Sequence, residues 1–176
     1  MCEAFSFSLI CNKCKKLLKP EFIKKDDVIS FYRYEDIEYL IKFKYEKFGS
    51  FVFKELSTPF SFFSKNYPNK LNIIPIDDKI NKGYSHTAIL ANAMKKDKKL
   101  FSTLHAKSEI KYAGKSLEFR LNNPRNFKYS GPKNIDVILI DDVVTTGTTL
   151  KEAKEVLKRH NVNVLFSLVL ADLREF

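Results

Sequence analysis

The stretch that most constrains this chain lies at residues 135–150, IDVILIDDVVTTGTTL. It opens with a mostly apolar run, residues 135–140, rich in the β-branched side chains of a strand buried on both faces of a parallel sheet. Two adjacent carboxylates follow, Asp141 and Asp142, and then a polar turn that contains Gly147. After the turn, apolar residues recur at steps of three and four, as in a helix that packs on a sheet. The sequence therefore predicts a strand, two acids, a turn and a helix in direct succession.

The turn has the chemistry of an anion site. A helix start presents unpaired N–H groups and the positive end of the helix dipole, which suit a phosphate. Gly147 allows a ligand to approach the backbone closely. The natural partners of Asp141 and Asp142 are vicinal hydroxyls or a metal. A sugar 5-phosphate would suit both parts, with its hydroxyls on the acids and its phosphate in the turn. The alternative interpretation is an acidic strand end followed by a well-capped helix.

Length and charge restrict the class of protein. The chain has 176 residues, 30% of them charged and 44% hydrophobic, which fits one medium globular domain with a substantial core. It has no apolar run of about 18 residues, and its first residues do not resemble a secretion signal. The net charge of +10 favours a highly phosphorylated substrate, nucleic acid or an acidic membrane face as partner. The alternative is a lysine-rich, solvated surface.

The three cysteines all lie near the start of the chain, at Cys2, Cys11 and Cys14. The last two form a C-x-x-C pair, whose spacing lets two thiolates bind one tetrahedral Zn²⁺. A structural zinc site needs four ligands, and this segment offers three. The fourth ligand would come from a cysteine upstream of Cys2, from another residue or from water. The alternatives are a zinc site that has decayed, or buried or free thiols.

Hydrophobic patterns elsewhere predict an α/β fold, a mostly parallel sheet flanked by helices. The expected helices start near residues 35, 51, 88 and 150, and lysines on the first of them are expected to face outward. Pro59 is expected to bend or end the second helix. The expected strands are residues 28–34, 71–76, 101–105, 135–140 and 162–170.

Two basic segments would complete an anion site. The loop after the strand at 71–76 carries Lys79 and Lys82, where a pyrophosphate would bind beside a sugar phosphate. Residues 106–134 form a long, basic and irregular stretch that includes Arg120 and Arg125, and such a segment inside a compact domain is usually a functional lid or a disordered insertion. A solvated loop is the alternative. His86, just after the first of these segments, is interpreted as a hydrogen-bond donor to phosphate or as a helix-capping group.

The motif VILIDDVVTTGTTL resembles the phosphoribosyl-pyrophosphate (PRPP) motif of type I phosphoribosyltransferases. The resemblance implies that fold and assigns the ribose hydroxyls to Asp141 and Asp142, as the catalytic acids. It implies Mg²⁺ as cofactor, and it assigns Lys79, Lys82, Arg120 and Arg125 to the leaving pyrophosphate. The 5-phosphate would bind to the loop that follows the acids, namely Val143, Val144, Thr145, Thr146, Gly147, Thr148 and Thr149.

The order of segments resembles, more narrowly, the ComF family of competence proteins. These carry an N-terminal zinc-binding segment, expected here at residues 1–27, and a phosphoribosyltransferase domain, expected at residues 28–176. The stretch IPIDDKINKGYSHTAILANAM is similar to that family's pyrophosphate loop and following helix. Three departures stand out: the first cysteine pair is reduced to one residue, two aspartates enter the pyrophosphate loop, and Ser85-His86 replaces the family's Asn-Gln.

The resemblance implies two functions of different classes. One is an enzyme in which a nitrogen nucleophile attacks C1 of PRPP and expels pyrophosphate, with catalysis by positioning and charge stabilisation. The other is a non-catalytic factor that binds single-stranded DNA and works with the DNA-uptake machinery in natural transformation. The expected location is cytoplasmic, with a peripheral association with the inner membrane left open. The acceptor of the enzymatic reaction has no signature in the sequence.

Overall fold

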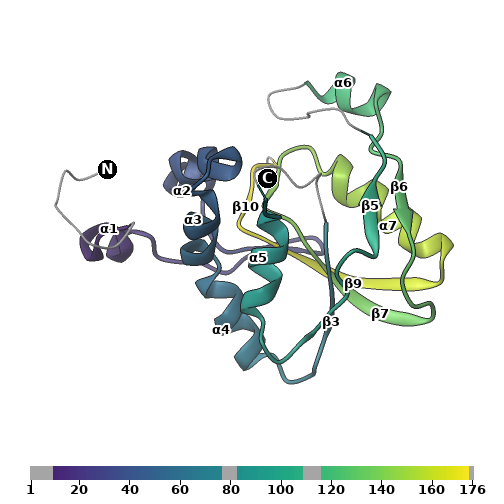
Figure 1. The fold of residues 1–176 in the computed structure, drawn as a ribbon, viewed down its shortest axis with the longest axis horizontal. Coiled ribbons are helices and arrows are strands. Elements are labelled where there is room, and N and C mark those ends of the chain that lie inside the picture. Colours follow the sequence, from purple (N-terminus) through teal and green to yellow (C-terminus); the bar gives the residue numbers. More distant parts are fainter. Residues whose placement is uncertain (1–9, 77–82, 109–115, 175–176) are drawn as a thin grey trace.

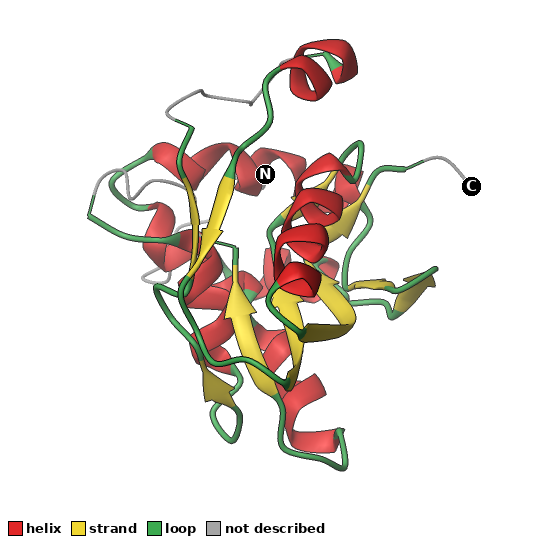
Figure 2. Ribbon diagram, turned by 90° about the vertical axis from the view of Figure 1, so that its right-hand side faces the viewer, coloured by secondary structure: helices red, strands yellow, loops and turns green. Residues whose placement is uncertain are grey.

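The computed structural model describes residues 10–76, 83–108 and 116–174. Its centre is a six-stranded sheet with helices on both faces (Figures 1 and 2). Of the pairings in this sheet, only the first, at its edge, is antiparallel among the described residues. The predicted α/β fold with a mostly parallel sheet is confirmed. In order across the sheet the strands are β1 (Ile23–Lys25), β2 (Val28–Ser30), β9 (Val162–Val169), β7 (Ile135–Ile140), β3 (Asn72–Pro75) and β4 (Lys98–Lys99).

The central strand β7 is buried on both faces, as its composition predicts. Its last four residues, 137–140, are fully buried. Ile138 and Ile140 pack into the core on one face of the sheet, and Val137 and Leu139 pack into the core on the other. A strand with two buried faces needs apolar side chains at consecutive positions, which is why this segment does not alternate with polar residues.

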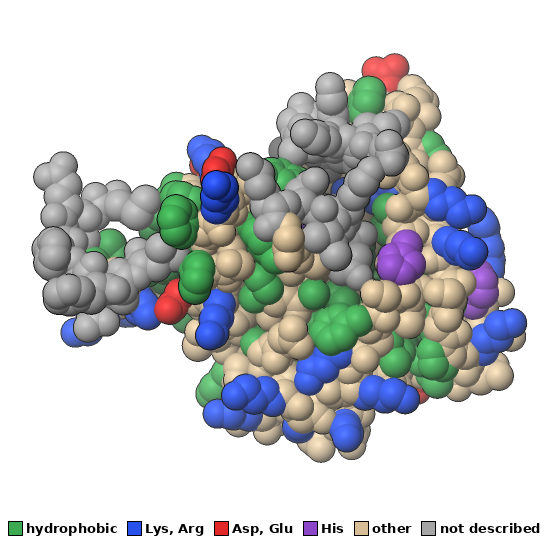
Figure 3. All heavy atoms as spheres, in the orientation of Figure 1, with side chains coloured by type: hydrophobic (Ala, Val, Ile, Leu, Met, Phe, Trp, Pro, Cys, Tyr) green, Lys and Arg blue, Asp and Glu red, His purple; other side chains and the backbone are tan. Residues whose placement is uncertain are grey.

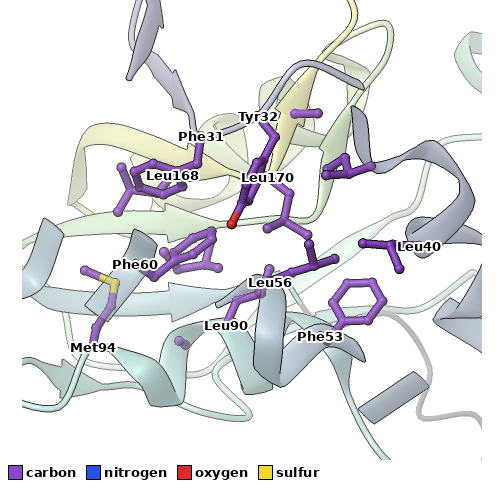
Figure 4. Packing of buried hydrophobic residues seen from close by; sticks show 14 of the residues in the cluster. Phe31, Tyr32, Leu40, Phe53, Leu56, Phe60, Leu90, Met94, Leu168 and Leu170 are labelled. Carbon is purple, nitrogen blue, oxygen red and sulfur yellow. The ribbon is translucent and has the colours of Figure 1, made fainter. Parts of the chain in front are cut away.

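One face of the sheet is covered by helices from the first half of the chain (Figure 1). Figure 4 shows the packing in this core, where Phe31, Phe53, Phe60 and Leu90 are fully buried. The rings of Phe31 and Phe60 meet at 4.6 Å between centroids. The covering helices are α2 (Tyr34–Ile41), α3 (Gly49–Leu56), α4 (Thr58–Asn66) and α5 (His86–Ala93).

The other face is covered by α7 (Thr148–Arg159) and a two-stranded ribbon of β5 (Leu104–Ala106) and β6 (Phe127–Tyr129). The short helix α6 (Leu117–Asn122) lies at the far end of this ribbon, away from the sheet (Figures 1 and 2). The prediction of an irregular stretch over residues 106–134 is therefore wrong in part. Part of this stretch forms strand β6, because Phe127 and Tyr129 are buried against the sheet. The strand expected at 101–105 lies in this ribbon and not in the main sheet.

The helix predicted from residue 35 is shorter than its apolar pattern suggests. It ends at Ile41 and gives way to the 3₁₀ turn η1 (Lys42–Tyr45). The next expected helix is two helices, and Pro59 lies in the first turn of α4, where the missing proline N–H has no consequence. Within the described residues no helix is both long and apolar enough to cross a membrane.

The described part of the N-terminal segment packs on the rest of the chain. Helix α1 (Asn12–Leu17) follows Cys11, and Cys14 contributes to the core that α2 to α5 cover. Strand β1 pairs with β2 across the expected boundary after residue 27. The division into a segment and a domain stays a prediction.

Candidate ribose-phosphate site

The paired acids follow β7 directly, at the carboxyl end of a central strand. Both are buried, with Asp141 8% and Asp142 6% exposed. Their backbone is tied to the neighbouring chain, because the Asp141 N–H donates to the Leu168 carbonyl at 3.2 Å and the Leu170 N–H donates to the Asp142 carbonyl at 2.8 Å. Buried carboxylates are stable only with hydrogen-bond or charge partners, so these acids differ from a solvated strand end.

The segment after the acids has the backbone of an anion-binding turn. Its first two residues form β8 (Val143–Val144), which pairs with β10 (Ala171–Asp172). Gly147 has a φ of 75°, in the left-handed region that favours glycine, and it caps α7. The hydroxyl oxygens of Thr146 and Thr148 lie 3.0 Å apart. The first-turn amides of α7 and the positive end of its dipole therefore meet this loop.

Arg174, which the sequence prediction missed, lies beside the loop. A Cβ added to Gly147 would lie 3.6 Å from Cδ of Arg174. The guanidinium donates to the Asp172 carboxylate from Nη2 at 2.6 Å and from Nε at 3.0 Å. This hydrogen bonding raises the pKa of Arg174 above its ordinary value. The sequence feature that could have identified Arg174 is a basic residue directly after the last strand of a parallel sheet.

A lysine from the helical layer reaches the paired acids. Lys44, in η1, places its Nζ 2.8 Å from Oδ2 of Asp142, and the two side chains are 13% and 8% exposed. His86, the first residue of α5, places Nε2 3.7 Å from the same oxygen. Lys44 was expected to face outward, and this expectation is wrong. His86 does not cap its helix, because Ser85 is the N-cap and accepts from the Ala88 N–H.

These contacts set the charge state of Asp142. Burial by itself would raise the pKa of its carboxyl. The Lys44 ammonium, the His86 ring and the Val143 amide together outweigh burial and hold that pKa well below its ordinary value. Asp142 is therefore an ionised acceptor at any physiological pH.

A tyrosine clamps the turn that carries Lys44. The hydroxyl of Tyr84 lies 2.7 Å from the Lys44 carbonyl oxygen, 3.3 Å from that of Phe43 and 3.2 Å from that of Glu46. Burial and the Glu46 carboxylate raise the pKa of Tyr84, so its hydroxyl stays protonated and can donate. Gly49 permits this packing, because a Cβ there would lie 2.0 Å from the Tyr84 oxygen.

Arg125, which was predicted as a site residue, lies just before β6 and links the two-stranded ribbon to the loop after the acids. The Nε of Arg125 donates to the Thr149 hydroxyl at 3.1 Å, and its N–H donates to Glu152 at 2.8 Å. Between the ribbon and α7 lies a cavity of about 840 Å³, with Lys107 and Arg159 among its lining residues. None of the described residues from 141 to 149 lines this cavity.

Several predicted site residues have no described position. Lys79, Lys82 and Cys2 lie outside the described residues. Arg120 belongs to α6, and its side chain is not described. The site that the structure brings together is thus Asp141, Asp142 and the loop 143–149, with Lys44, His86, Arg125 and Arg174 around them.

The remaining cysteines lie at α1. The Cys11 sulfur accepts from the Cys14 N–H at 3.4 Å and caps the helix. Within the described part of the chain, no three His, Cys, Asp or Glu side chains gather as a metal site would require. Cys2 lies outside that part, so zinc stays a prediction.

Comparison with known proteins identifies the family. The phosphoribosyl transferase domain family matches residues 81–175, more than half of the chain and all of the segment from the Tyr84 clamp to the last strands. The chain therefore belongs to this family. The predicted type I phosphoribosyltransferase fold is confirmed, and the acids and loop at 141–149 lie inside the matched region.

Two curated relatives are adenine phosphoribosyltransferases. The protein from Campylobacter hominis is 32% identical over 84 residues, which cover 47% of this chain and 43% of the relative. The protein from Aliarcobacter butzleri is 32% identical over 79 residues, which cover 45% of this chain and 40% of the relative. The matched part thus spans less than half the length of these curated relatives.

Solved structures with a similar fold include a hypoxanthine phosphoribosyltransferase from Staphylococcus aureus, at 19% identity and a TM-score of 0.44, over 70% of this chain and 67% of that one. An orotate phosphoribosyltransferase from Aeropyrum pernix matches at 22% identity and a TM-score of 0.42, over 91% of this chain and 78% of that one.

Phosphoribosyltransferases commonly use Mg²⁺, which prefers oxygen ligands and keeps several waters. The described residues are compatible with a Mg²⁺ ion that is coordinated by oxygen atoms of the ligand. Oδ2 of Asp142 already has the Lys44 ammonium as its cationic partner at 2.8 Å. A magnesium ion that binds together with the ligand would supply further positive charge for its phosphates without replacing Lys44 at Asp142.

Proposed function

We propose that this chain binds PRPP at the 141–149 site and transfers its ribose 5-phosphate to a nitrogen acceptor. The observation that supports the proposal most is the pair of buried acids, one held ionised, followed directly by a glycine-capped helix start. The acids suit the two ribose hydroxyls, and the loop suits the 5-phosphate. The family match covers both halves of this arrangement.

The reaction breaks the bond from C1 to the pyrophosphate oxygen and forms a bond from C1 to the acceptor nitrogen. Pyrophosphate leaves with the bonding electron pair, and the nitrogen loses its proton to solvent. Asp141 and Asp142 would hold the ribose, and the loop 143–149 would hold the phosphate, so that the chain acts mainly by positioning. Mg²⁺ would neutralise the pyrophosphate. Arg125, next to Thr149, and Lys79, Lys82 and Arg120 are the proposed cations for the leaving group.

Calorimetric titration with PRPP and Mg²⁺ tests the binding step. We expect Asp142→Asn to weaken binding about 10-fold or more, because it removes a charged acceptor worth about 1–3 kcal/mol. Asp136→Asn is the matched control, since Asp136 lies on the same strand at its other, exposed end. If the wild-type chain shows no heat of binding and no thermal stabilisation by PRPP, the proposed function is wrong.

Pyrophosphate release tests turnover. Adenine, hypoxanthine and orotate, the bases in the names of the relatives and neighbours, form the first acceptor panel. We propose that a purine base is the acceptor, because two curated relatives that share 32% identity with this chain are named for adenine. Release with adenine but not with orotate is the expected result, and release with orotate alone would contradict it.

A second candidate function is the one that the ComF resemblance implies, single-stranded DNA binding in natural transformation. Its structural support is the basic surface, since Lys and Arg outnumber Asp and Glu on the face shown in Figure 3. Exposed aromatic rings such as Phe48, Phe51 and Phe62 could stack on bases. Binding driven by phosphates must weaken steeply with salt, so an affinity for an oligonucleotide that is equal at 50 and about 200 mM salt would contradict it.

The proposal includes the finer organisation expected from the sequence. Residues 1–27 would form a zinc-binding segment and residues 28–176 the phosphoribosyltransferase domain. The location would be cytoplasmic, with DNA-uptake proteins as partners and the inner membrane as a peripheral contact. These parts depend on the resemblance to ComF proteins.

A further inference from the structure

Three lysines lie close together in the sequence, in and just after η1, but they differ in exposure and in their partners. Lys42 pairs with Glu38 at 2.8 Å on the surface, where its side chain is 70% exposed. Lys47 is exposed. Lys44 instead turns inward, is 13% exposed and meets Asp142. A lysine is rarely withdrawn from water without a specific partner, so this placement is a feature of the fold.

The position of Lys44 is enforced by its surroundings. The Tyr84 hydroxyl is within hydrogen-bond distance of three carbonyl oxygens on the segment 43–46. Gly49 lets this segment and Tyr84 approach, since any Cβ would lie 2.1 Å from the Phe43 carbonyl oxygen. Two residues after Tyr84, His86 faces the same carboxylate oxygen as Lys44 does.

The positive charge of Lys44 offsets the negative charge of the buried acids. Ribose phosphates are polyanions, whereas the groups that suit their hydroxyls here are two adjacent, buried carboxylates. Without a counter-charge these acids would repel the phosphates of the very ligand whose diol they accept. A cation 2.8 Å from Asp142 removes most of that repulsion while it leaves the carboxylate ionised.

We propose that Lys44 is a charge-balancing, positioning residue of the ribose site, which lets a polyanionic ribose phosphate bring its hydroxyls to Asp142. Tyr84 and Gly49 hold it in place. The proposal rests on the proposed function, because it assumes that Asp142 accepts the ribose diol. His86 adds a second group against the same carboxylate oxygen.

A comparison of two ligands tests this role. Ribose 5-phosphate and PRPP share the diol and the 5-phosphate, but PRPP also carries a pyrophosphate. For Lys44→Met we expect binding of ribose 5-phosphate to weaken about 5-fold and that of PRPP about 50-fold, because the loss grows with ligand charge. A lysine that only supports the fold would weaken both ligands equally.

Matched variants complete the experiment. Lys44→Arg keeps the charge and should bind both ligands within about 3-fold of wild type, whereas Lys42→Met, the surface control, should match wild type. Tyr84→Phe removes only the clamping hydroxyl and should again weaken PRPP more than ribose 5-phosphate. It carries the test if Lys44→Met does not fold.

The outcomes separate the two proposals. If the wild-type chain binds neither ligand, the proposed function fails. If wild type binds both ligands and Asp142→Asn weakens both, but Lys44→Met loses affinity equally for both or binds PRPP more tightly, the role of Lys44 alone is refuted. Tighter binding would identify Lys44 as a competitor of the ribose hydroxyls.

Discussion

The buried pair of Lys44 and Asp142 makes a direct prediction about stability. At 2.8 Å the attraction is about 6 kcal/mol for an effective dielectric constant near 20, and desolvation of both groups offsets most of it. Lys44→Met removes the attraction but leaves the carboxylate buried. We therefore expect it to lower the free energy of unfolding by about 3–5 kcal/mol at pH 7.

The same pair predicts how this loss depends on pH. In the wild-type protein the pKa of Asp142 is lowered on folding, so the stability from its ionised form is complete above the ordinary carboxyl pKa and is lost as the pH falls below it. Lys44→Met removes the ammonium that lowers the pKa of Asp142 most, so this pKa rises toward the value that burial favours, and protonation relieves the buried charge. The difference in stability between wild type and variant should therefore shrink as the pH falls from 7 to about 4.5.

A double-mutant cycle measures the interaction. Urea unfolding of wild type, Lys44→Met, Asp142→Asn and the double variant gives the coupling energy, which we expect to be about 2 kcal/mol. A coupling below about 0.5 kcal/mol at pH 7, or a loss in Lys44→Met that is the same at pH 7 and 4.5, would refute the reasoning. Lys42→Met, whose pair with Glu38 is exposed, should change stability by less than about 0.5 kcal/mol.

Three further predictions concern other parts of the chain. Gly49→Ala should lower stability by more than about 2 kcal/mol in urea unfolding, because its Cβ would collide with the Tyr84 hydroxyl, and Tyr84→Phe in the same chain should restore part of the loss. Asp97→Ala should cost about 2–3 kcal/mol by the same measurement, since this buried carboxylate accepts from the Ser64 hydroxyl at 2.6 Å; a loss under about 0.5 kcal/mol would contradict that role. If zinc is bound, metal analysis should find about one equivalent in the purified protein and none in Cys11→Ser, and equal zinc in both would exclude this cysteine as a ligand.

The sequence predicts the part of the site that lies in one continuous stretch. Strand, acids, glycine turn and helix at 135–150 follow one another, and each has a local signature: β-branched residues, adjacent carboxylates, a left-handed glycine and an amphipathic repeat. The structure has all of them in that order. Arg125 was also predicted in the site, and it reaches Thr149, although the ribbon that carries it was expected to be irregular.

Lys44 could not be predicted in the same way, because its partner is almost a hundred residues away. Its local pattern is that of an amphipathic helix with lysines outward, and propensity alone continues that helix to about residue 48. Tertiary contacts override it: the carbonyl oxygens of residues 43, 44 and 46 surround the Tyr84 hydroxyl, which donates to them, and the Lys44 ammonium pairs with Asp142. Helix propensity amounts to only a few tenths of a kcal/mol per residue, so tertiary contacts routinely override it.

The segment from Gly83 to His86 arranges groups around Asp142 that do not belong to the loop 143–149. Gly83 has a φ of 82° and turns the chain, Tyr84 then fixes the turn that carries Lys44, Ser85 caps α5, and His86 faces Asp142. One short connection thus sets two of the groups that surround the carboxylate, while β7 sets the carboxylate itself. A change in this connection should therefore alter ligand affinity through the charge balance at Asp142 and not through the loop 143–149, which α7 and β10 hold separately.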